Sequence, residues 1–105
     1  MRENEYQAYL IKEIKRRFPG CIVLKNDPDY LQGIPDLTIL YGTHWACLEV
    51  KANENARERA NQRYYIRTLD RMSYASFIFP ENEEDVFHDL QRALEPERFS
   101  RVSQR

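Results

Sequence analysis

The sequence predicts a single α/β domain in which helices flank a mixed four-stranded sheet, in the order helix, three strands, helix, strand, helix. Three observations predict it. The 105 residues are enough for one hydrophobic core but not for two. Helical periodicity marks both ends of the chain and the segment after residue 51, and short apolar runs lie between. We expect the domain to span residues 1–94 and residues 95–105 to form a mobile tail.

The first helix is predicted over residues 3–18. Leu10, Ile14 and other apolar residues recur there at helical spacing, up to the Pro-Gly pair that ends the pattern. A step of about 100° per residue places Glu3 on the continuation of this buried stripe and Glu5 roughly opposite. Judged from the residues alone, Glu3 either complements the helix dipole or points into an active site.

A strand over residues 21–25 and a loop over residues 26–34 follow the first helix. The strand is apolar at its centre, and the loop opens with Asn-Asp-Pro-Asp, which is typical of turns. Lys25, Tyr30 and Gln32 are candidates for substrate contact, because loops at the mouth of a site often bind substrate. The alternative is that they are ordinary solvated residues.

The next two strands form a predicted hairpin around Gly42-Thr43, a two-residue turn with Gly first, as a type II′ turn requires. Counting back from this turn places Asp36 opposite Glu49. Paired side chains share a face with Cβ atoms roughly 4.5–5.5 Å apart, and two like charges there cost stability. Lys51 lies two residues beyond Glu49 and therefore on the same face. Two carboxylates and an ammonium thus converge where both strands end.

This combination suits phosphodiester hydrolysis with a hard metal ion. Mg²⁺ prefers oxygen ligands and keeps several waters, which leaves room for phosphate oxygens. We expect Asp36 and Glu49 to be metal ligands, with the carbonyl of Val50 as a further ligand, and Lys51 to position the nucleophile. The bare pattern is not specific, and the alternative is that Glu49 and Lys51 form the solvated face of an edge strand.

A second helix is predicted over residues 55–72, directly after the proposed site. Arg57, Arg59 and Arg63 are either part of a solvated face or contacts to phosphates. Gln62 lies at the upstream edge of the buried side. Four residues are predicted to make that side: Tyr65, Ile66, Leu69 and Met72. Because both faces of the hairpin are mostly apolar, we expect helices on both sides of the sheet.

The fourth strand is predicted over residues 74–79 and the third helix from about Asn82 to Leu94. Acidic residues in the first turn of this helix complement its dipole, and Val86, Leu90 and Leu94 are expected on its buried side.

Two segments, GIPDL at residues 33–37 and ACLEVK at residues 46–51, resemble the PD-(D/E)xK nuclease superfamily. The resemblance is to its VRR-NUC and Holliday-junction-resolvase-like branches, as found in small phage nucleases. The predicted order of elements agrees with the core of that superfamily over nearly the whole chain. The resemblance implies endonucleolytic cleavage of branched, junction or flap DNA with Mg²⁺, or with Mn²⁺ in its place, and a homodimer.

The resemblance also implies roles for further residues. These branches place a glutamate in their first helix, often as E-x-x-apolar-Q, which matches residues 3–7 here. Glu3 is therefore the expected third acid, as a metal ligand directly or through water, with Glu5 as the alternative. VRR-NUC domains carry a glutamine near the start of their second helix, so Gln62 is expected to support the site; the alternative is a polar residue at a core margin. The candidate substrate contacts named above then become candidate DNA contacts.

Composition narrows the functional classes. The net charge of −1 counts against a protein that coats DNA. The chain has no run of 18 apolar residues and a polar N-terminus, so we expect a cytoplasmic protein without a membrane partner. Its two cysteines lie far apart without a CxxC motif, which argues against a zinc site.

Two other functions compete with a structure-selective nuclease. One is a non-catalytic DNA-binding or replication-accessory module, which the modest charge favours. The other is a restriction-type or mismatch enzyme of the same superfamily. We disfavour the latter because nothing in the chain resembles an insertion that reads sequence.

Overall fold

The computed structural model of the chain describes residues 1–98, and it confirms the predicted α/β fold with its mixed four-stranded sheet and flanking helices. The elements follow in the predicted order, with a short 3₁₀ helix, η1, before the last helix. Their bounds are α1 Glu3–Arg17, β1 Ile22–Lys25, β2 Leu37–Tyr41, β3 His44–Val50, α2 Gln62–Met72, β4 Ala75–Ile78, η1 Pro80–Asn82 and α3 Glu83–Leu94.

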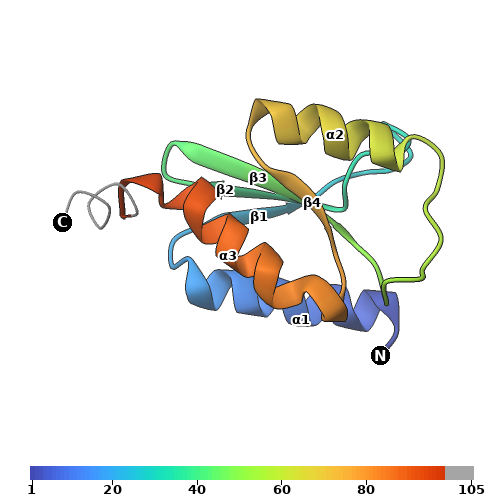
Figure 1. Cartoon of the computed structure of the whole chain (residues 1–105), viewed down its shortest axis with the longest axis horizontal. Helices are drawn as coiled ribbons and strands as arrows, with labels where there is room; N and C mark the ends of the chain where they lie inside the picture. The colour runs from blue at the N-terminus through green and yellow to red at the C-terminus, as the bar shows by residue number, and fades with distance from the viewer. Residues whose placement is uncertain (99–105) are drawn as a thin grey trace.

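The sheet has the strand order β1-β2-β3-β4. Strands β1, β2 and β3 pair antiparallel with one another. Strand β4 runs parallel to β3, because α2 returns the chain to the end of the sheet at which β3 begins. Helices α1 and α3 lie on one face of this sheet and α2 lies on the other (Figure 1). The two helical layers cover the faces of the sheet, so the connecting loops lie at the ends of the strands.

The hairpin register agrees with the prediction from the turn. Gly42 has φ +61°, whereas Thr43 is not among the residues with positive φ, as a type II′ turn requires. Leu40 pairs with Trp45, and the antiparallel ladder continues in the same register toward the ends of β2 and β3. The register therefore brings Asp36, just before β2, beside β3.

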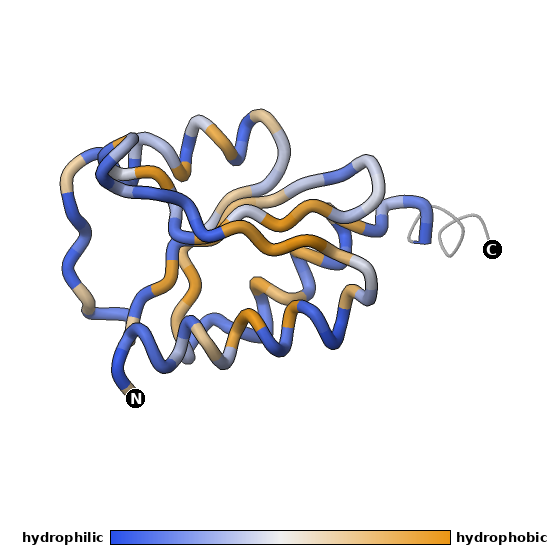
Figure 2. The backbone as a smooth tube through the Cα atoms, turned by 180° about the vertical axis from the view of Figure 1, so that it is seen from behind, coloured by the Kyte–Doolittle hydropathy of each residue, from blue (hydrophilic) through white to orange (hydrophobic). Residues whose placement is uncertain are grey.

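One apolar core lies between the sheet and the pair α1 and α3. The stripe predicted for α1 is buried at Leu10 and Ile14, and the stripe predicted for α3 is buried at Leu90 and Leu94. Figure 2 shows hydrophobic residues concentrated in the strands and mainly hydrophilic residues along the long connection between β3 and α2. Because the core packs closely against the strands, it also holds the strand ends in place, where the predicted site residues lie.

The start of the second helix is wrong in the prediction. Helix α2 begins at Gln62, and the residues before it form a loop. Two backbone groups of this loop are bound by side chains: the carbonyl of Arg57 accepts a hydrogen bond from Lys51 Nζ at 3.0 Å, and the N–H of Arg59 donates to Gln62 Oε1 at 2.8 Å. Tertiary contacts of this kind override helix propensity. Arg57 and Arg59 are consequently loop residues.

Coverage of the second face of the sheet is also less complete than predicted. Helix α2 packs on β3 and β4, while the outer strand β1 has no helix over that face. Ile22, Leu24 and Leu40 are therefore exposed by 57%, 44% and 38%. Met72, predicted on the buried side of the helix, is exposed by 67% because α2 ends there. We call Ile22, Leu24 and Leu40 the apolar strip.

The segment expected to form a tail lies beside the hairpin turn where it is described. Glu97 Oε1 is 3.1 Å from His44 Nε2. The remaining residues of the expected tail, 99–105, lie outside the described residues.

Across residues 1–98, no helix has the length and apolar character that crossing a bilayer requires.

Candidate metal centre

The predicted site residues meet at the end of the sheet where β3 stops and both α1 and α2 begin (Figure 1). A cavity of about 410 Å³ lies there. The first turns of α1, the loop between β1 and β2, and the loop before α2 form its walls. Its lining includes Glu3, Asp36, Glu49, Lys51 and Gln62. Segments far apart in the sequence thus enclose one polar space.

Three carboxylates form a cluster in this cavity. Glu3, Asp36 and Glu49 each offer an oxygen, and these oxygens lie within 4.8 Å of one another. The two opposed acids also bind the backbone across the hairpin: Asp36 N–H donates to Glu49 Oε1 at 3.2 Å, and Val50 N–H donates to Asp36 Oδ2 at 2.9 Å. The backbone therefore fixes both carboxylates before any ligand binds.

The two glutamates of the first helical turn differ in position. Glu3 lies in the carboxylate cluster, whereas Glu5 forms an exposed ion pair with Arg2, with Arg2 Nε 2.6 Å from Glu5 Oε1. The difference follows from the helical step that places Glu3 above the buried stripe of α1. Gln7, one turn after Glu3, also lines the cavity.

Burial has a marked effect on Glu49, which is only 3% exposed. Loss of solvation and, next, the nearby charge of Asp36 raise the pKa of Glu49 to about 8, although Lys51 opposes the shift. Without a cation, the fold therefore holds a proton at this pair of acids near neutral pH. A bound cation would relieve the same repulsion.

The carbonyl of Val50, the last residue of β3, has no donor opposite it in the β2–β3 ladder. Continuing the β2–β3 register past its last pair places Pro35 opposite Val50, and proline has no N–H to donate to that carbonyl. The N–H of Val50 points to Asp36, and in a strand the N–H and C=O of one residue point to the same side. The Val50 carbonyl therefore points to the side of β3 on which Asp36 lies and has no donor in the ladder. Val50 is 0% exposed and does not line the cavity, so its role as a ligand stays a prediction.

Lys51 and Gln62 form a buried network behind the acids. Lys51 Nζ donates to Gln62 Oε1 at 2.8 Å and lies 3.7 Å from Glu49 Oε2, while Gln62 Nε2 donates to Glu49 Oε2 at 2.9 Å. With the N–H of Arg59 as a second donor to Gln62 Oε1, only one orientation of the amide satisfies every partner. Two of the three N–H groups of Lys51 are thus used among the described residues, by Gln62 and the Arg57 carbonyl.

Asn26 holds the segment that carries Asp36, a role that the sequence analysis missed. Its N–H donates to the Asp36 carbonyl at 2.8 Å, and its side-chain amide donates to the Pro35 carbonyl at 2.8 Å and to Thr38 Oγ1 at 2.9 Å. The available signal was an Asn directly after a predicted strand, but that pattern indicates only a turn.

Gly33 joins the two loops that wall the cavity, and this contact was also missed. It has φ +93°, and a Cβ there would lie 2.6 Å from Asn61 Cβ. Asn61 itself adopts the left-handed conformation, with φ 68°, directly before α2. Only glycine fits this position, because it needs both the positive φ and the close backbone approach.

The six candidate DNA contacts differ in whether they line the cavity that holds the acids. Gln32 and Arg59 line the cavity. Tyr30 is exposed on the loop that lines it, and Arg57 is exposed on the loop before α2. Arg63 forms an ion pair with Glu58 and lies over the Phe77 ring, and Lys25 is exposed at the end of β1, so neither is part of the lining. Within residues 1–98, the side chains of Arg57 and Arg59 form no ion pair.

No protein-family model, curated protein sequence or solved structure matches this chain.

Proposed function

We propose that the chain is a metal-dependent DNA endonuclease of the PD-(D/E)xK type, related to the VRR-NUC and Holliday-junction-resolvase-like nucleases. The observation that carries this proposal is the cluster of Glu3, Asp36 and Glu49 with its buried lysine, Lys51, beside them. Carboxylates that face one another at the cost of stability, next to a lysine held in position, suit hydrolysis of a phosphodiester.

The donor set fits a hard divalent cation. It consists of the carboxylate oxygens of Glu3, Asp36 and Glu49, to which we add the Val50 carbonyl as a proposed ligand; oxygen ligands of this kind suit Mg²⁺ or Mn²⁺. The group of possible ligands among the described residues consists of three acids, without a thiolate or an imidazole. Asp36 and Glu49 would hold the ion with the Val50 carbonyl, and Glu3 would assist directly or through a water. When bound, Mg²⁺ supplies Lewis-acid activation of water and neutralises charge that develops on the phosphate.

The remaining residues hold the reacting groups in place. Lys51 has one N–H left after its bonds to Gln62 and the Arg57 carbonyl, and this N–H orients the attacking water or a phosphate oxygen. Gln62 fixes Glu49 and Lys51 relative to each other, because it binds both. Arg59, which lines the cavity without an ion pair, is the first candidate to contact a flanking phosphate.

The proposal extends to substrate, assembly and location. We place the enzyme in the cytoplasm and expect branched, junction or flap DNA as its substrate.

Each chain brings together one cluster of this kind among its described residues, so cutting both strands of a symmetric junction takes two copies. The apolar strip supports a homodimer, since an exposed apolar surface is a typical site of self-association. Light scattering of the purified protein tests this; a monomer would indicate a nickase.

The decisive experiment compares cleavage of plasmid, linear, nicked, flapped and four-way DNA with Mg²⁺ and with a chelator. Cleavage is expected only with Mg²⁺ or Mn²⁺. Asp36→Asn should abolish it, and Lys51→Ala should lower the rate by about 10²-fold. Glu3→Gln should lower activity, whereas the matched variant Glu5→Gln, in the same helical turn but outside the cluster, should not. Cleavage that survives Asp36→Asn would overturn the proposal.

A non-catalytic DNA-binding module with the same fold is the second candidate. Its support is the modest net charge of −1, and the intact set of Asp36, Glu49 and Lys51 argues against it. It predicts that DNA binds but stays intact in Mg²⁺ and in Mn²⁺, so the same gels distinguish the two functions.

A further inference from the structure

We propose that Tyr30 is a stacking platform for an unpaired base, so that the site takes DNA that is single-stranded next to the scissile phosphate. This inference rests on the proposed function and names the substrate class of that site.

Tyr30 is presented to solvent without a partner. Its exposed fraction, 87%, exceeds that of every other large hydrophobic residue described. Within residues 1–98, its ring packs against no other ring and its hydroxyl makes no hydrogen bond. The next residue, Leu31, is also 37% exposed. An aromatic ring exposed in this way has a free π-face for a ligand.

The loop that carries Tyr30 is held in place by its own backbone. Asp29 N–H donates to Asp27 Oδ1 at 2.8 Å, and the N–H groups of Tyr30 and Leu31 donate to the Asp27 carbonyl at 3.2 and 3.3 Å. At the far end, Gly33 is packed against Asn61. Because the fold already fixes this backbone, little conformational entropy remains to be lost when a ligand stacks on the ring.

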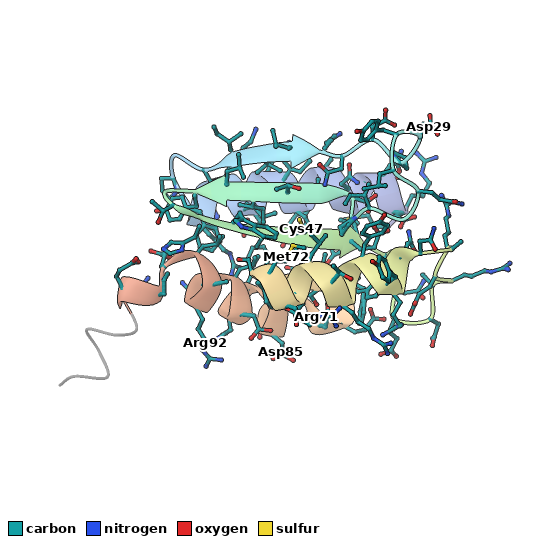
Figure 3. All side chains as sticks on the ribbon, turned by 90° about the horizontal axis from the view of Figure 1, so that it is seen from above. Asp29, Cys47, Arg71, Met72, Asp85 and Arg92 are labelled. Carbon is teal, nitrogen blue, oxygen red and sulfur yellow. The ribbon has the colours of Figure 1, made fainter. Side chains whose placement is uncertain are left out.

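Tyr30 belongs to the loop that walls the cavity, although Tyr30 itself is not part of the lining. Asp29 and Gln32, on either side of Tyr30 and Leu31 in the chain, both line the cavity that holds the carboxylate cluster. Asp29 lies at the outer end of its loop, beyond the strands of the sheet (Figure 3). We therefore expect a nucleotide that enters the cavity with its phosphate near the acids to pass beside the loop that carries Tyr30.

Charge decides which part of the nucleic acid meets this loop. Residues 26–36 contain no lysine or arginine, and the exposed acids Asp27 and Asp29 directly precede Tyr30. These acids repel phosphates, so the loop is unsuited to contact the backbone of a duplex. The exposed arginines Arg57 and Arg59 lie on the other loop, the one before α2.

This asymmetry orients a strand, with its phosphates toward the arginines and a base toward Tyr30. A base within a duplex is already stacked on both faces. The base that stacks on Tyr30 must therefore be unpaired, as in single-stranded nucleic-acid recognition by aromatic side chains.

Binding is measured with Ca²⁺ in place of Mg²⁺, by fluorescence anisotropy of a labelled single strand, the blunt duplex of the same sequence, and that duplex with a single-stranded overhang. Tyr30→Ala should weaken binding of the single strand and the overhang by about tenfold and leave binding of the blunt duplex unchanged. Tyr30→Phe should bind like the wild type, because it keeps the ring. The matched control is Tyr64→Ala, at a tyrosine that is 62% exposed on α2 and does not line the cavity.

The inference is overturned if the wild type and Tyr30→Ala bind the single strand equally well. It is also overturned if Tyr30→Phe binds as weakly as Tyr30→Ala, or if the wild type binds the blunt duplex more tightly than the single strand. The outcome is independent of hydrolysis. Binding through Tyr30 without cleavage in Mg²⁺ would refute the proposed function alone, whereas cleavage with binding indifferent to Tyr30 would refute this inference alone.

Discussion

The two faces of the sheet differ in what they bury. The face against α1 and α3 packs a continuous apolar core. The face toward α2 has only a small apolar cluster around Cys47 and Ile66. The carboxylates lie at one end of this second face, and the apolar strip lies on β1 and β2. Cys47 lies between the sheet and α2 (Figure 3). Neighbours in β3 show the contrast, since Leu48 joins the large core and Glu49 joins the acids.

This difference assigns separate tasks to the two faces. A strand alternates its side chains with a period of two, so one seven-residue strand, β3, supports the core with one set of residues and the site with the other. We therefore expect substitutions on the core face to change stability, and substitutions on the site face to change chemistry and its response to pH.

The largest effect on stability is expected on the core face. Leu90, on α3 and 0% exposed, loses its packing in Leu90→Ala, which should lower the free energy of unfolding by about 3 kcal/mol. Urea unfolding measures this change, and the proposed nuclease activity should remain at temperatures well below the melting point. Loss of activity in a folded Leu90→Ala protein would show that the two faces are not separate.

The next effect is expected where the loops of the site meet. Gly33→Ala places a Cβ 2.6 Å from Asn61 Cβ at φ +93°, and should cost about 2 kcal/mol and displace the loop that carries Tyr30. Gly20→Ala is the matched control, because Gly20 has φ +89° but no atom within 4 Å of the added Cβ. Thermal unfolding of both variants separates the cost of the backbone conformation from the cost of the clash. Equal melting temperatures would contradict the close contact.

A pH-dependent effect should belong to the site face alone. The folded state raises the pKa of Glu49 to about 8, so it binds the proton more tightly than the unfolded state does. The resulting stability is present at low pH and is lost as the pH rises toward 8. Relative to Glu49→Gln, which stays neutral, the metal-free wild type should lose at most about 1.4 kcal/mol between about pH 7 and pH 8. Unfolding in a chelator at several pH values measures this loss, and Mg²⁺ should abolish it; a difference that does not depend on pH would contradict the shift.

The smallest effect is expected on the apolar strip. Ile22→Ser and Leu24→Ser change exposed side chains, so each should alter the free energy of unfolding by less than about 0.5 kcal/mol. Together they should lower self-association in light scattering if the strip is buried in a homodimer. A large loss of stability in a monomeric protein would mean that the strip packs within the chain.

Local rules explain which parts of the fold were predictable. The turn at Gly42 sets the register of the hairpin, so the approach of Asp36 to Glu49 follows from counting. The stripe of α1 likewise separates Glu3 from Glu5, because helical geometry is regular. In both cases, neighbours in the sequence determine the outcome.

The remaining features depend on contacts between distant segments. The loop before α2 packs against Gly33 of the loop between β1 and β2, and no pattern within either loop contains that information. The exposure of Met72 and of the apolar strip depends on which strands α2 covers. The role of Asn26 requires the fold to bring it to Pro35.

The position of Gln62 couples the chemistry to local opening of the chain. Gln62 is the first residue of α2, and its amide also binds Glu49, Lys51 and the N–H of Arg59. Unwinding of the first helical turn would therefore release both charged residues and expose that N–H to solvent. Exchange of the Arg59 amide proton with deuterium should slow when a cation occupies the acids, so this single backbone proton reports on the occupancy of the site.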